Sequence, residues 1–281
     1  MQQGYRYSEA QYFRFVREQY RPNEFEMEDA GDTRFVPGSH NAAVNGQRFH
    51  RMLRLLSSHI EALSDEAAVD IGFFPGTWIN LCQYFWPEIR WHGVGLCISD
   101  SFRSWAEAAG ISVEEADLDP FYARKGVVEP LPHTDASIDL VVASEIFEHL
   151  ISPLPFLEES ARVLKPGALL LLTTPNVSNI GSLIRLLRGE SNHERLLRSP
   201  MFLREDEWRG HIRLYSKSEL QWLAGRYGLE MIEHHYYHDD YPLHVLSRRG
   251  VGVVMQRLLR RAFGIVPWFR GGQLAMFRRK I

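Results

Sequence analysis

Long apolar runs alternate with amphipathic stretches through most of this chain. The strongest runs, each bounded by turn residues, occupy residues 67–71, 91–97, 138–144 and 168–174, with a weaker one at 111–116. A run without polar alternation is typical of a strand that is buried on both faces of a parallel sheet. Helical spacing of apolar residues fills the intervals, so the pattern predicts an α/β fold of alternating strands and helices.

Turn and capping signals set the ends of the predicted helices. These helices cover residues 77–85, 102–109, 155–164, 180–187 and 219–227. Gly110 ends the second helix and Pro166-Gly167 stops the third, while Ser216 with Glu219 forms a capping box before the last. Two late strands are predicted at residues 229–237 and 273–278.

Residues 1–66 precede the first predicted strand and carry a helical pattern. Ser8 with Gln11 forms another capping box, and apolar residues follow helical spacing over 48–63. We therefore expect a helical N-terminal extension over 1–66 that could act as a lid, followed by an α/β domain over 67–281. Residues 177–215 are expected to be an insert in that domain.

Composition narrows the classes of function. The chain has 281 residues, of which 45% are hydrophobic, and a formal net charge of −3. This near-neutral balance gives no reason to expect a nucleic-acid partner. Cys82 and Cys97 are too few for a disulfide framework and favour a reducing, cytoplasmic compartment. Because no apolar signal segment opens the chain and no apolar run reaches ~18 residues, neither secretion nor a transmembrane helix is expected.

A turn with two glycines follows the first predicted strand, in the segment Val69-Asp70-Ile71-Gly72-Phe73-Phe74-Pro75-Gly76. Ligands of doubly wound sheets bind at the carboxyl ends of the strands. Glycines there let the backbone approach a ligand, and Gly72 and Gly76 suit this role. Asp70 could accept a hydrogen bond from a ligand ammonium or from loop amides. An ordinary strand-to-helix turn is the alternative interpretation.

Further segments follow this turn in a fixed order along the chain. They are residues 138–142, Glu145-Ile146-Phe147-Glu148-His149-Leu150, Arg162-Val163-Leu164-Lys165-Pro166-Gly167 and Thr173-Thr174-Pro175-Asn176. Together with the turn, they resemble the class I S-adenosylmethionine-dependent methyltransferases, and most closely a bacterial branch that includes small-molecule and sugar O-methyltransferases. The resemblance implies S-adenosyl-L-methionine as the cofactor. It also implies a Rossmann-like, doubly wound, seven-stranded sheet that is mostly parallel, with an antiparallel last strand.

The resemblance also implies a set of cofactor-binding residues. The loop made of Asp70, Gly72, Phe73, Phe74, Pro75 and Gly76 would hold the methionine end. Asp117 or Leu118 would lie near the adenine, Cys97 and Ile98 near the ribose, and Ser144 and Glu145 near the sulfonium.

The chain departs from the family's pattern at two of these positions. Phe74 stands where the loop usually has a middle glycine, and Cys97 stands where an acidic residue usually binds both ribose hydroxyls. A thiol cannot supply a charged bidentate acceptor, and losing such a contact costs roughly 1–3 kcal/mol of binding energy. Asp100, shortly after Cys97, could substitute.

Glu145, Glu148 and His149 follow the fourth predicted strand at positions i, i+3 and i+4. On a helix that begins there, all three share one face. His149 could be a general base oriented by Glu145 or Glu148. Alternatively, the three could bind Mg²⁺ or Mn²⁺, which would lower the pKa of a substrate hydroxyl. Resemblance to metal-binding relatives adds His211 as a further ligand. A purely structural role, in which the Glu-His pair caps the helix, is the third alternative.

The C-terminal part of the chain is basic. Residues 241–281 contain nine Arg or Lys and no acid, and residues 247–270 include an amphipathic stripe. This segment could pack on the domain or lie on an anionic membrane as a peripheral contact. His234, His235 and His238 are expected to be surface histidines, because a strand directs the first two to opposite faces.

The resemblance implies an enzyme that methylates a hydroxyl oxygen of a glycan, a nucleotide-sugar or a similar small metabolite. Aromatic and arginine side chains of residues 1–66 and 177–215 would form the acceptor pocket. Two alternatives stay open at this point. One is a non-catalytic protein that keeps the fold for binding or scaffolding, and the other is a methyltransferase for a lipid-linked acceptor.

Overall fold

The computed structural model describes residues 7–29, 46–60, 67–96, 98–119, 129–191, 203–204, 207–208, 210–237 and 265–281. The strands are β1 (Ala67–Ile71), β2 (Arg90–Gly95), β3 (Ser112–Glu115), β4 (Ile138–Ser144), β5 (Leu164–Pro175), β6 (Leu203–Arg204), β7 (Glu207–Trp208), β8 (Leu229–Tyr237) and β9 (Gly272–Arg279). The helices are α1 (Glu9–Glu18), α2 (Glu24–Asp29), α4 (Gly46–Ser57), α5 (Thr77–Phe85), α6 (Asp100–Ala108), α7 (Leu154–Val163), α8 (Ile180–Leu187) and α9 (Lys217–Gly225), with short 3₁₀ turns η2 (Phe147–His149) and η5 (Pro267–Phe269).

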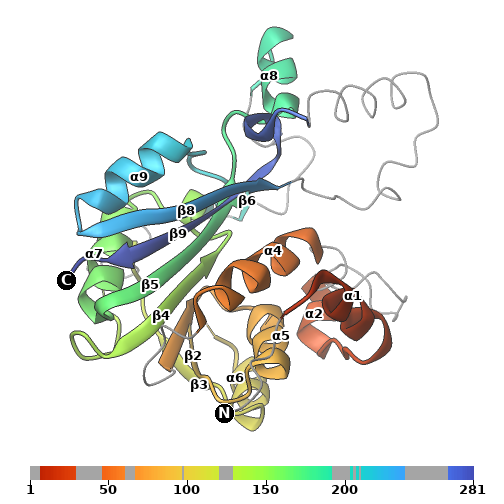
Figure 1. Ribbon diagram of the computed structural model, residues 1–281, viewed down its shortest axis with the longest axis vertical. Coiled ribbons are helices and arrows are strands. Elements are labelled where there is room, and N and C mark those ends of the chain that lie inside the picture. The colour runs from red at the N-terminus through yellow and green to blue at the C-terminus, as the bar shows by residue number, and fades with distance from the viewer. Residues whose placement is uncertain are drawn as a thin grey trace.

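One seven-stranded sheet organises the molecule, with strand order β3-β2-β1-β4-β5-β9-β8 (Figure 1). The pairs from β3 to β5 are parallel, whereas β9 runs antiparallel to both β5 and β8. This arrangement confirms the predicted mostly parallel sheet with an antiparallel last strand. The chain builds outward from β1 to β3 and then returns to place β4 beside β1, so the order of strands reverses between β1 and β4. The carboxyl ends of these two strands are where ligands of doubly wound sheets bind.

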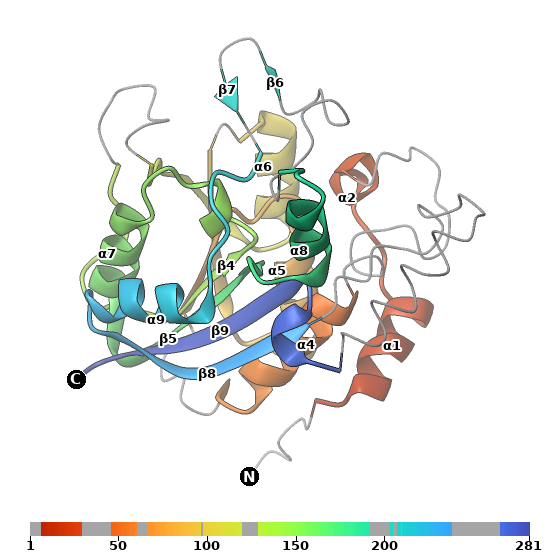
Figure 2. The same ribbon diagram turned by 90° about the horizontal axis from the view of Figure 1, so that it is seen from above.

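Helices cover both faces of the sheet and enclose two layers of apolar core. Along β1, Ala68 belongs to the core layer under α4, α5 and α6, whereas Val69 belongs to the layer under α7 and α9. Figure 1 shows α7 and α9 on the side opposite α4 and α5. Figure 2 shows α1 and α2 on the side of α4 and α5, so these described helices of the N-terminal extension lie on the same face of the sheet. Because both faces are covered, the strands are apolar on both sides, as the continuous runs predicted.

Most predicted elements are present at or near the predicted bounds. The helices over 77–85 and 180–187 and the strands over 138–144 and 229–237 have the predicted ends. Both capping boxes form, Ser8 with Gln11 before α1 and Ser216 with Glu219 before α9. β5 begins earlier than predicted, at Leu164, and continues through the Pro166-Gly167 signal.

Two predicted regions fall wholly or partly outside the described residues. In the predicted insert 177–215, the structure describes α8, the short antiparallel pair β6–β7 and residues 210–215. Of the predicted amphipathic segment 247–270, only residues 265–270 are described. Among the described ranges, no helix combines the length and the apolar character that a bilayer span requires.

Candidate active site

The turn after β1 is shaped by two glycines in the left-handed conformation. Gly72 has φ +77°, and its N–H donates to the carbonyl oxygen of Val94 at 2.7 Å. A Cβ atom at Gly72 would lie 2.5 Å from Cγ1 of Ile146 and closer still to its Cδ1. Glycine is therefore required here both by the backbone and by the close approach of the loop that follows β4. Gly72 brings the predicted cofactor loop and the predicted catalytic loop into contact.

Gly76 closes the turn and opens α5. Its φ is +88°, and a Cβ atom there would lie 2.5 Å from the ring of Trp105. The N–H of Gly76 donates to the carbonyl oxygen of Phe73 at 2.6 Å, and the carbonyl oxygen of Gly76 accepts from the N–H of Asn80 at 3.0 Å. The turn is thus closed by backbone hydrogen bonds and packs directly against Trp105 of α6.

The two phenylalanines of the turn point to different environments. Phe73 is buried, and its ring covers Gly93 of β2, where a Cβ atom would lie 2.6 Å from the ring. Phe74, at the position of the usual middle glycine, is 53% exposed and contacts Phe102 edge-on at 5.0 Å between ring centroids. Phe73 therefore belongs to the core under the sheet, while the Phe74 ring lies at the surface beside the turn.

The N-terminal extension reaches this turn directly. The side-chain amide of Asn23 donates to the carbonyl oxygen of Pro75 at 2.9 Å, and its Oδ1 accepts from the N–H of Glu26 at 2.8 Å, which caps α2. Phe25 packs edge-on against Phe102, at 5.0 Å. Sequence analysis did not assign Asn23 or Phe25 to the site, because no local pattern links them to a turn that lies some fifty positions later.

Asp70, at the end of β1, is a buried carboxyl on the α5 side of the sheet. Burial raises its pKa well above the usual value, and its charge helps to raise the pKa of the buried Cys82 thiol in α5. A carboxyl in this environment favours a nearby cation or a hydrogen-bond donor when it is ionised. The hydrogen bond that Asp70 is expected to accept from a ligand ammonium or from loop amides stays a prediction.

The predicted adenine-side residues follow β3. Asp117 and Leu118 are both buried, and Oδ1 of Asp117 accepts from the N–H of Asp119 at 3.0 Å. Asp119, which sequence analysis missed, accepts from the N–H of Ile151 at 2.5 Å and so ties this loop to the one after β4. The available signal was an Asp two positions after a residue predicted to lie near the adenine.

The predicted ribose-side residues follow β2. Ile98 is half-buried and packs over Gly95, while Asp100 starts α6 and is exposed. Cys97 lies outside the described residues.

Glu145 follows β4 in a strained backbone conformation. Its φ is +58°, which costs a non-glycine residue about 1–3 kcal/mol and is concentrated at functional sites. The hydroxyl of Tyr237 donates to its Oε1 at 3.0 Å, and Nη1 of Arg48 lies 3.7 Å from its Oε2. Ser144, just before it, is half-buried with its hydroxyl 3.1 Å from that of Thr173. The extension, through Arg48 of α4, therefore contributes a cation to the end of β4.

Glu148 is fully buried and lies between two histidines. Its Oε2 accepts from the hydroxyl of Thr174 at 2.8 Å, and its Oε1 lies 3.9 Å from Nε2 of both His149 and His211. The backbone carbonyl of Glu148 accepts from the N–H of Ile212 at 2.8 Å, which brings the strand-like segment carrying His211 to the site. Burial, and secondarily the charge of Glu145, raises the pKa of Glu148 well above the usual value.

The predicted helix through Glu145, Glu148 and His149 is wrong. The chain forms only the three-residue turn η2 there, because Glu145 takes a left-handed φ and Pro153 follows closely. Glu145 consequently points to Tyr237 and Arg48 rather than to His149. At this end of the sheet, Glu148, His149 and His211 form a group with metal-ligand spacing, because their ligand atoms lie within 4.8 Å of one another. Glu145 is not a member of that group.

Two chemical capabilities follow from this arrangement. An imidazole that a buried carboxyl holds in position can accept a proton from a ligand. The same three side chains offer one carboxylate and two imidazole ligands to a divalent cation. Both capabilities are located beside the carboxyl end of β4, which faces the turn of Gly72 and Gly76.

The sheet and its covering helices form the fold seen in solved methyltransferase structures. Residues 44–234 match the sequence profile of the family described as "Methyltransferase domain", and the chain belongs to that family. The match begins inside the N-terminal extension and ends in β8, so it includes the strand-end loops described above.

Curated relatives match this chain over short spans. A protein assigned as an S-adenosylmethionine-dependent methyltransferase of Mycolicibacterium smegmatis is 45% identical over 53 residues, which are 19% of this chain and 21% of that protein. The ubiquinone biosynthesis O-methyltransferase of Maricaulis maris is 36% identical over 78 residues, 27% of this chain and 30% of that protein. The chain thus spans less than a third of the length of these relatives.

Solved structures match over most of the chain. A protein assigned as a sarcosine dimethylglycine methyltransferase of Galdieria sulphuraria superposes with a TM-score of 0.53 at 16% identity, covering 83% of this chain and 84% of that one. A SAM-dependent methyltransferase of Archaeoglobus fulgidus gives 0.51 at 14% identity, covering 83% and 96%. At these identities the likeness establishes the fold alone.

Proposed function

We propose that this enzyme methylates a hydroxyl oxygen of a small acceptor, such as a glycan, a nucleotide-sugar or a similar hydroxylated metabolite. The observation that carries the proposal is the buried Glu148 between His149 and His211, beside the carboxyl end of β4. A hydroxyl must lose its proton when it is methylated, and this cluster offers a proton acceptor at the end of the sheet where ligands bind. Similarity to the O-methyltransferase of Maricaulis maris supports oxygen as the acceptor atom.

The residues of the strand ends fit the family's cofactor. Gly72 and Gly76 leave the two ends of the turn without a side chain, and Asp70 and Glu145 put carboxyl groups at the ends of β1 and β4, which favours a cationic ligand. The exposed Phe74 ring adds a flat apolar surface beside the turn. S-adenosylmethionine, when bound, would supply a methyl group made electrophilic by its sulfonium.

The chain's own residues would then position the acceptor and remove its proton. His149 is the proposed proton acceptor, because its side chain is 36% exposed while Glu148 behind it is fully buried. Glu148, held by Thr174, would orient His149. The carbonyl of Gly210, 3.3 Å from Nδ1 of His149, fixes the ring from its other side. Glu145 would face the ligand from a backbone conformation that its neighbours Tyr237 and Arg48 hold in place.

The same cluster supports a metal-assisted variant of this mechanism. Glu148, His149 and His211 offer three ligand atoms, and a bound Mg²⁺ or Mn²⁺ would lower the pKa of the acceptor hydroxyl. Imidazole ligands favour Mn²⁺ over Mg²⁺. In this variant His149 would be a ligand of the metal ion and not the proton acceptor.

A transfer assay with methyl-labelled S-adenosylmethionine and pools of hydroxylated acceptors tests the proposal. We expect the label in an alkali-stable ether of a glycan, nucleotide-sugar or small alcohol. His149→Ala should lower turnover by roughly 10²–10⁴-fold, with little change in cofactor affinity measured by titration calorimetry. His235→Ala, on the exposed part of β8, is the matched control. Label found only in amines or alkali-labile esters, or full turnover by His149→Ala, would overturn the proposal.

Chelation separates the two variants of the mechanism. In the direct variant, treatment with a chelator leaves turnover unchanged. In the metal-assisted variant, chelation abolishes turnover and Mn²⁺ restores it, but not in His211→Ala.

A lipid-linked acceptor is the second candidate. The described end of the basic segment exposes Ile265 (78%) and Trp268 (55%) beside Arg270, a combination found at membrane interfaces. Co-sedimentation with vesicles that contain anionic lipid tests it. Binding at low salt that Trp268→Ala abolishes would support this candidate, and absence of binding would remove it.

A further inference from the structure

A second cluster of metal-ligating side chains lies on the sheet, on elements that the strand-end site does not use. His92 of β2, Glu114 of β3 and His133 of the segment before β4 bring one ligand atom each within 4.8 Å of the others. His92 pairs with Ser112 and Val94 pairs with Glu114 in the register of β2 and β3, so His92 and Glu114 share one face of the sheet. The His133 ring meets the His92 ring at right angles, with 4.9 Å between centroids.

Four polar atoms of this cluster are buried without a hydrogen bond among the described residues. The side chain of His133 is only 7% exposed, and both of its ring nitrogens lack a hydrogen bond. Nδ1 of His92 and Oε2 of Glu114 are also buried without one. Nε2 of His133 lies 3.6 Å from Oε2 of Glu114, which is within ion-pair distance but too long for a hydrogen bond. Buried polar atoms without hydrogen bonds cost free energy, so these four atoms indicate that a ligand binds here.

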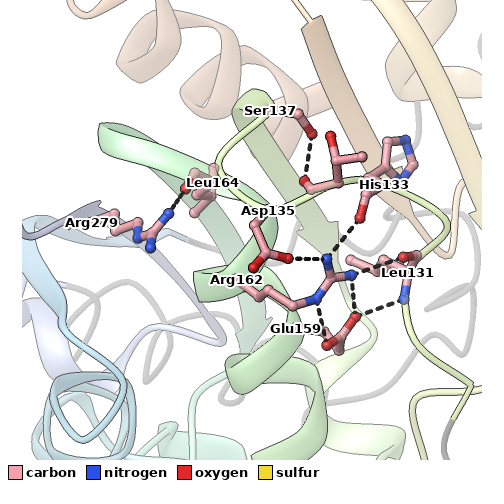
Figure 3. A network of polar contacts seen from close by, with 9 residues as sticks. Leu131, His133, Asp135, Ser137, Glu159, Arg162, Leu164 and Arg279 are labelled. Carbon is pink, nitrogen blue, oxygen red and sulfur yellow. Dashed lines mark hydrogen bonds and ion pairs between the residues drawn. The ribbon is translucent and has the colours of Figure 1, made fainter.

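A hydrogen-bond network around Arg162 holds the backbone of His133 in place, on the side away from the His133 ring (Figure 3). The guanidinium of Arg162 donates to the carbonyl oxygens of His133 and Leu131, at 2.7 and 2.9 Å, and to the carboxylates of Asp135 and Glu159. Figure 3 shows the His133 ring on the side away from Arg162. The ring is thus presented to β2 and β3 by a backbone that α7 fixes, which is the preorganisation that metal sites need.

We propose that His92, Glu114 and His133 form a binding site for a divalent transition-metal ion, with Zn²⁺ as the ion that this donor set matches best. Two neutral imidazoles and one carboxylate are a common ligand set of zinc sites, with a water in the fourth position. The ion would satisfy the three buried ligand atoms at once. It would also join the edge strand β3, its neighbour β2 and the connection that leads to β4, so its role would be to stabilise this edge of the sheet.

The test is a titration of the chelator-treated full chain in the His211→Gln background, which disables the other candidate metal cluster. We expect one equivalent of Zn²⁺ by calorimetry, visible absorption bands on addition of Co²⁺, and a higher unfolding temperature with Zn²⁺. Both His133→Gln and Glu114→Gln in that background should weaken binding at least about tenfold and remove the gain in unfolding temperature. Glu114 lies on the partly exposed edge strand, so its variant tests the site even if the His133 variant unfolds.

Two results would overturn the proposal. One is the absence of saturable Zn²⁺ or Co²⁺ binding in the His211→Gln background. The other is binding that survives both His133→Gln and Glu114→Gln. Neither readout depends on methyl transfer, so failure here leaves the proposed function untouched, and failure of the transfer assay leaves this site untouched.

Discussion

Substitution of Gly72 by alanine tests whether the turn after β1 and the loop after β4 are locked together. Two separate penalties meet at this position. The left-handed φ of +77° is unfavourable for any residue with a Cβ atom, and that atom would overlap the side chain of Ile146. Gly110 has the same φ of +77°, with nothing within 4 Å of the position its Cβ atom would take, so it carries only the first penalty.

The magnitudes follow from these two terms. The backbone term costs about 1–2 kcal/mol of unfolding free energy. Overpacking against Ile146 adds about 1–3 kcal/mol. Gly72→Ala should therefore destabilise the protein by about 2–5 kcal/mol and Gly110→Ala by about 1–2 kcal/mol. Because Ile146 shares the loop with Glu145, Gly72→Ala should also weaken cofactor binding, whereas Gly110→Ala should not.

Urea unfolding of the two variants and of the Gly72→Ala/Ile146→Ala double variant measures these terms. The Ile146 change removes the overlapping atoms, so the double variant should be about 1–3 kcal/mol more stable than the sum of the single effects. Equal destabilisation by Gly72→Ala and Gly110→Ala would refute the reasoning. So would additive effects in the double variant, because they would mean that the two loops do not press on each other.

Other predictions concern the carboxyl groups of the site and the N-terminal extension. Burial raises the pKa of Glu148 above its usual 4.5, so the unfolding free energy should fall as the pH rises from 4.5 towards the folded-state pKa, by up to about 1.4 kcal/mol per pH unit. Glu148→Gln should flatten this slope in urea unfolding at a series of pH values, and an unchanged slope would contradict the assignment. Tyr237→Phe removes the donor to Glu145 and should cost about 0.5–1.5 kcal/mol in the same assay, with unchanged stability arguing against that hydrogen bond. Asn23→Ser keeps an N-cap for α2 but loses the amide donor to Pro75, so calorimetry should show weaker cofactor binding while the stability stays nearly normal. Asn23→Ala should weaken cofactor binding in the same way and also lose about 1 kcal/mol of stability. Normal cofactor affinity in both Asn23 variants would mean that the contact between the extension and the turn does not contribute to cofactor binding.

The sheet was predictable from sequence because its strands are buried on both faces. β4 is apolar from Leu140 to Ala143 and buried from Ile138 to Ala143, so most of the strand is visible in the pattern alone. The turn after β1 was predictable for a related reason, since only glycine tolerates φ +77° and φ +88° without strain. These are local constraints, and a local pattern can express them.

The rest of the site depends on contacts between distant segments, which no local pattern encodes. Arg48 reaches Glu145 from the N-terminal extension, and the backbone of Ile212 brings His211 to Glu148. The spacing of Glu145 and His149 predicted a helix, but the left-handed φ of Glu145 prevents it. The His92 cluster was invisible for the same reason, because its members meet only after β2 and β3 pair and the Arg162 network places His133.

The position of β9 has a consequence for the order of assembly. β9 follows β8 along the chain, yet it lies between β5 and β8 in the sheet. During synthesis β8 emerges before the strand that joins it to the rest, so it has no pairing partner in the sheet until β9 has been made. Until then the apolar β5 presents an open edge, which is a template for association with other chains. Closure of the sheet is therefore a late event that joins segments about a hundred positions apart, and the nascent protein depends on that step for its solubility.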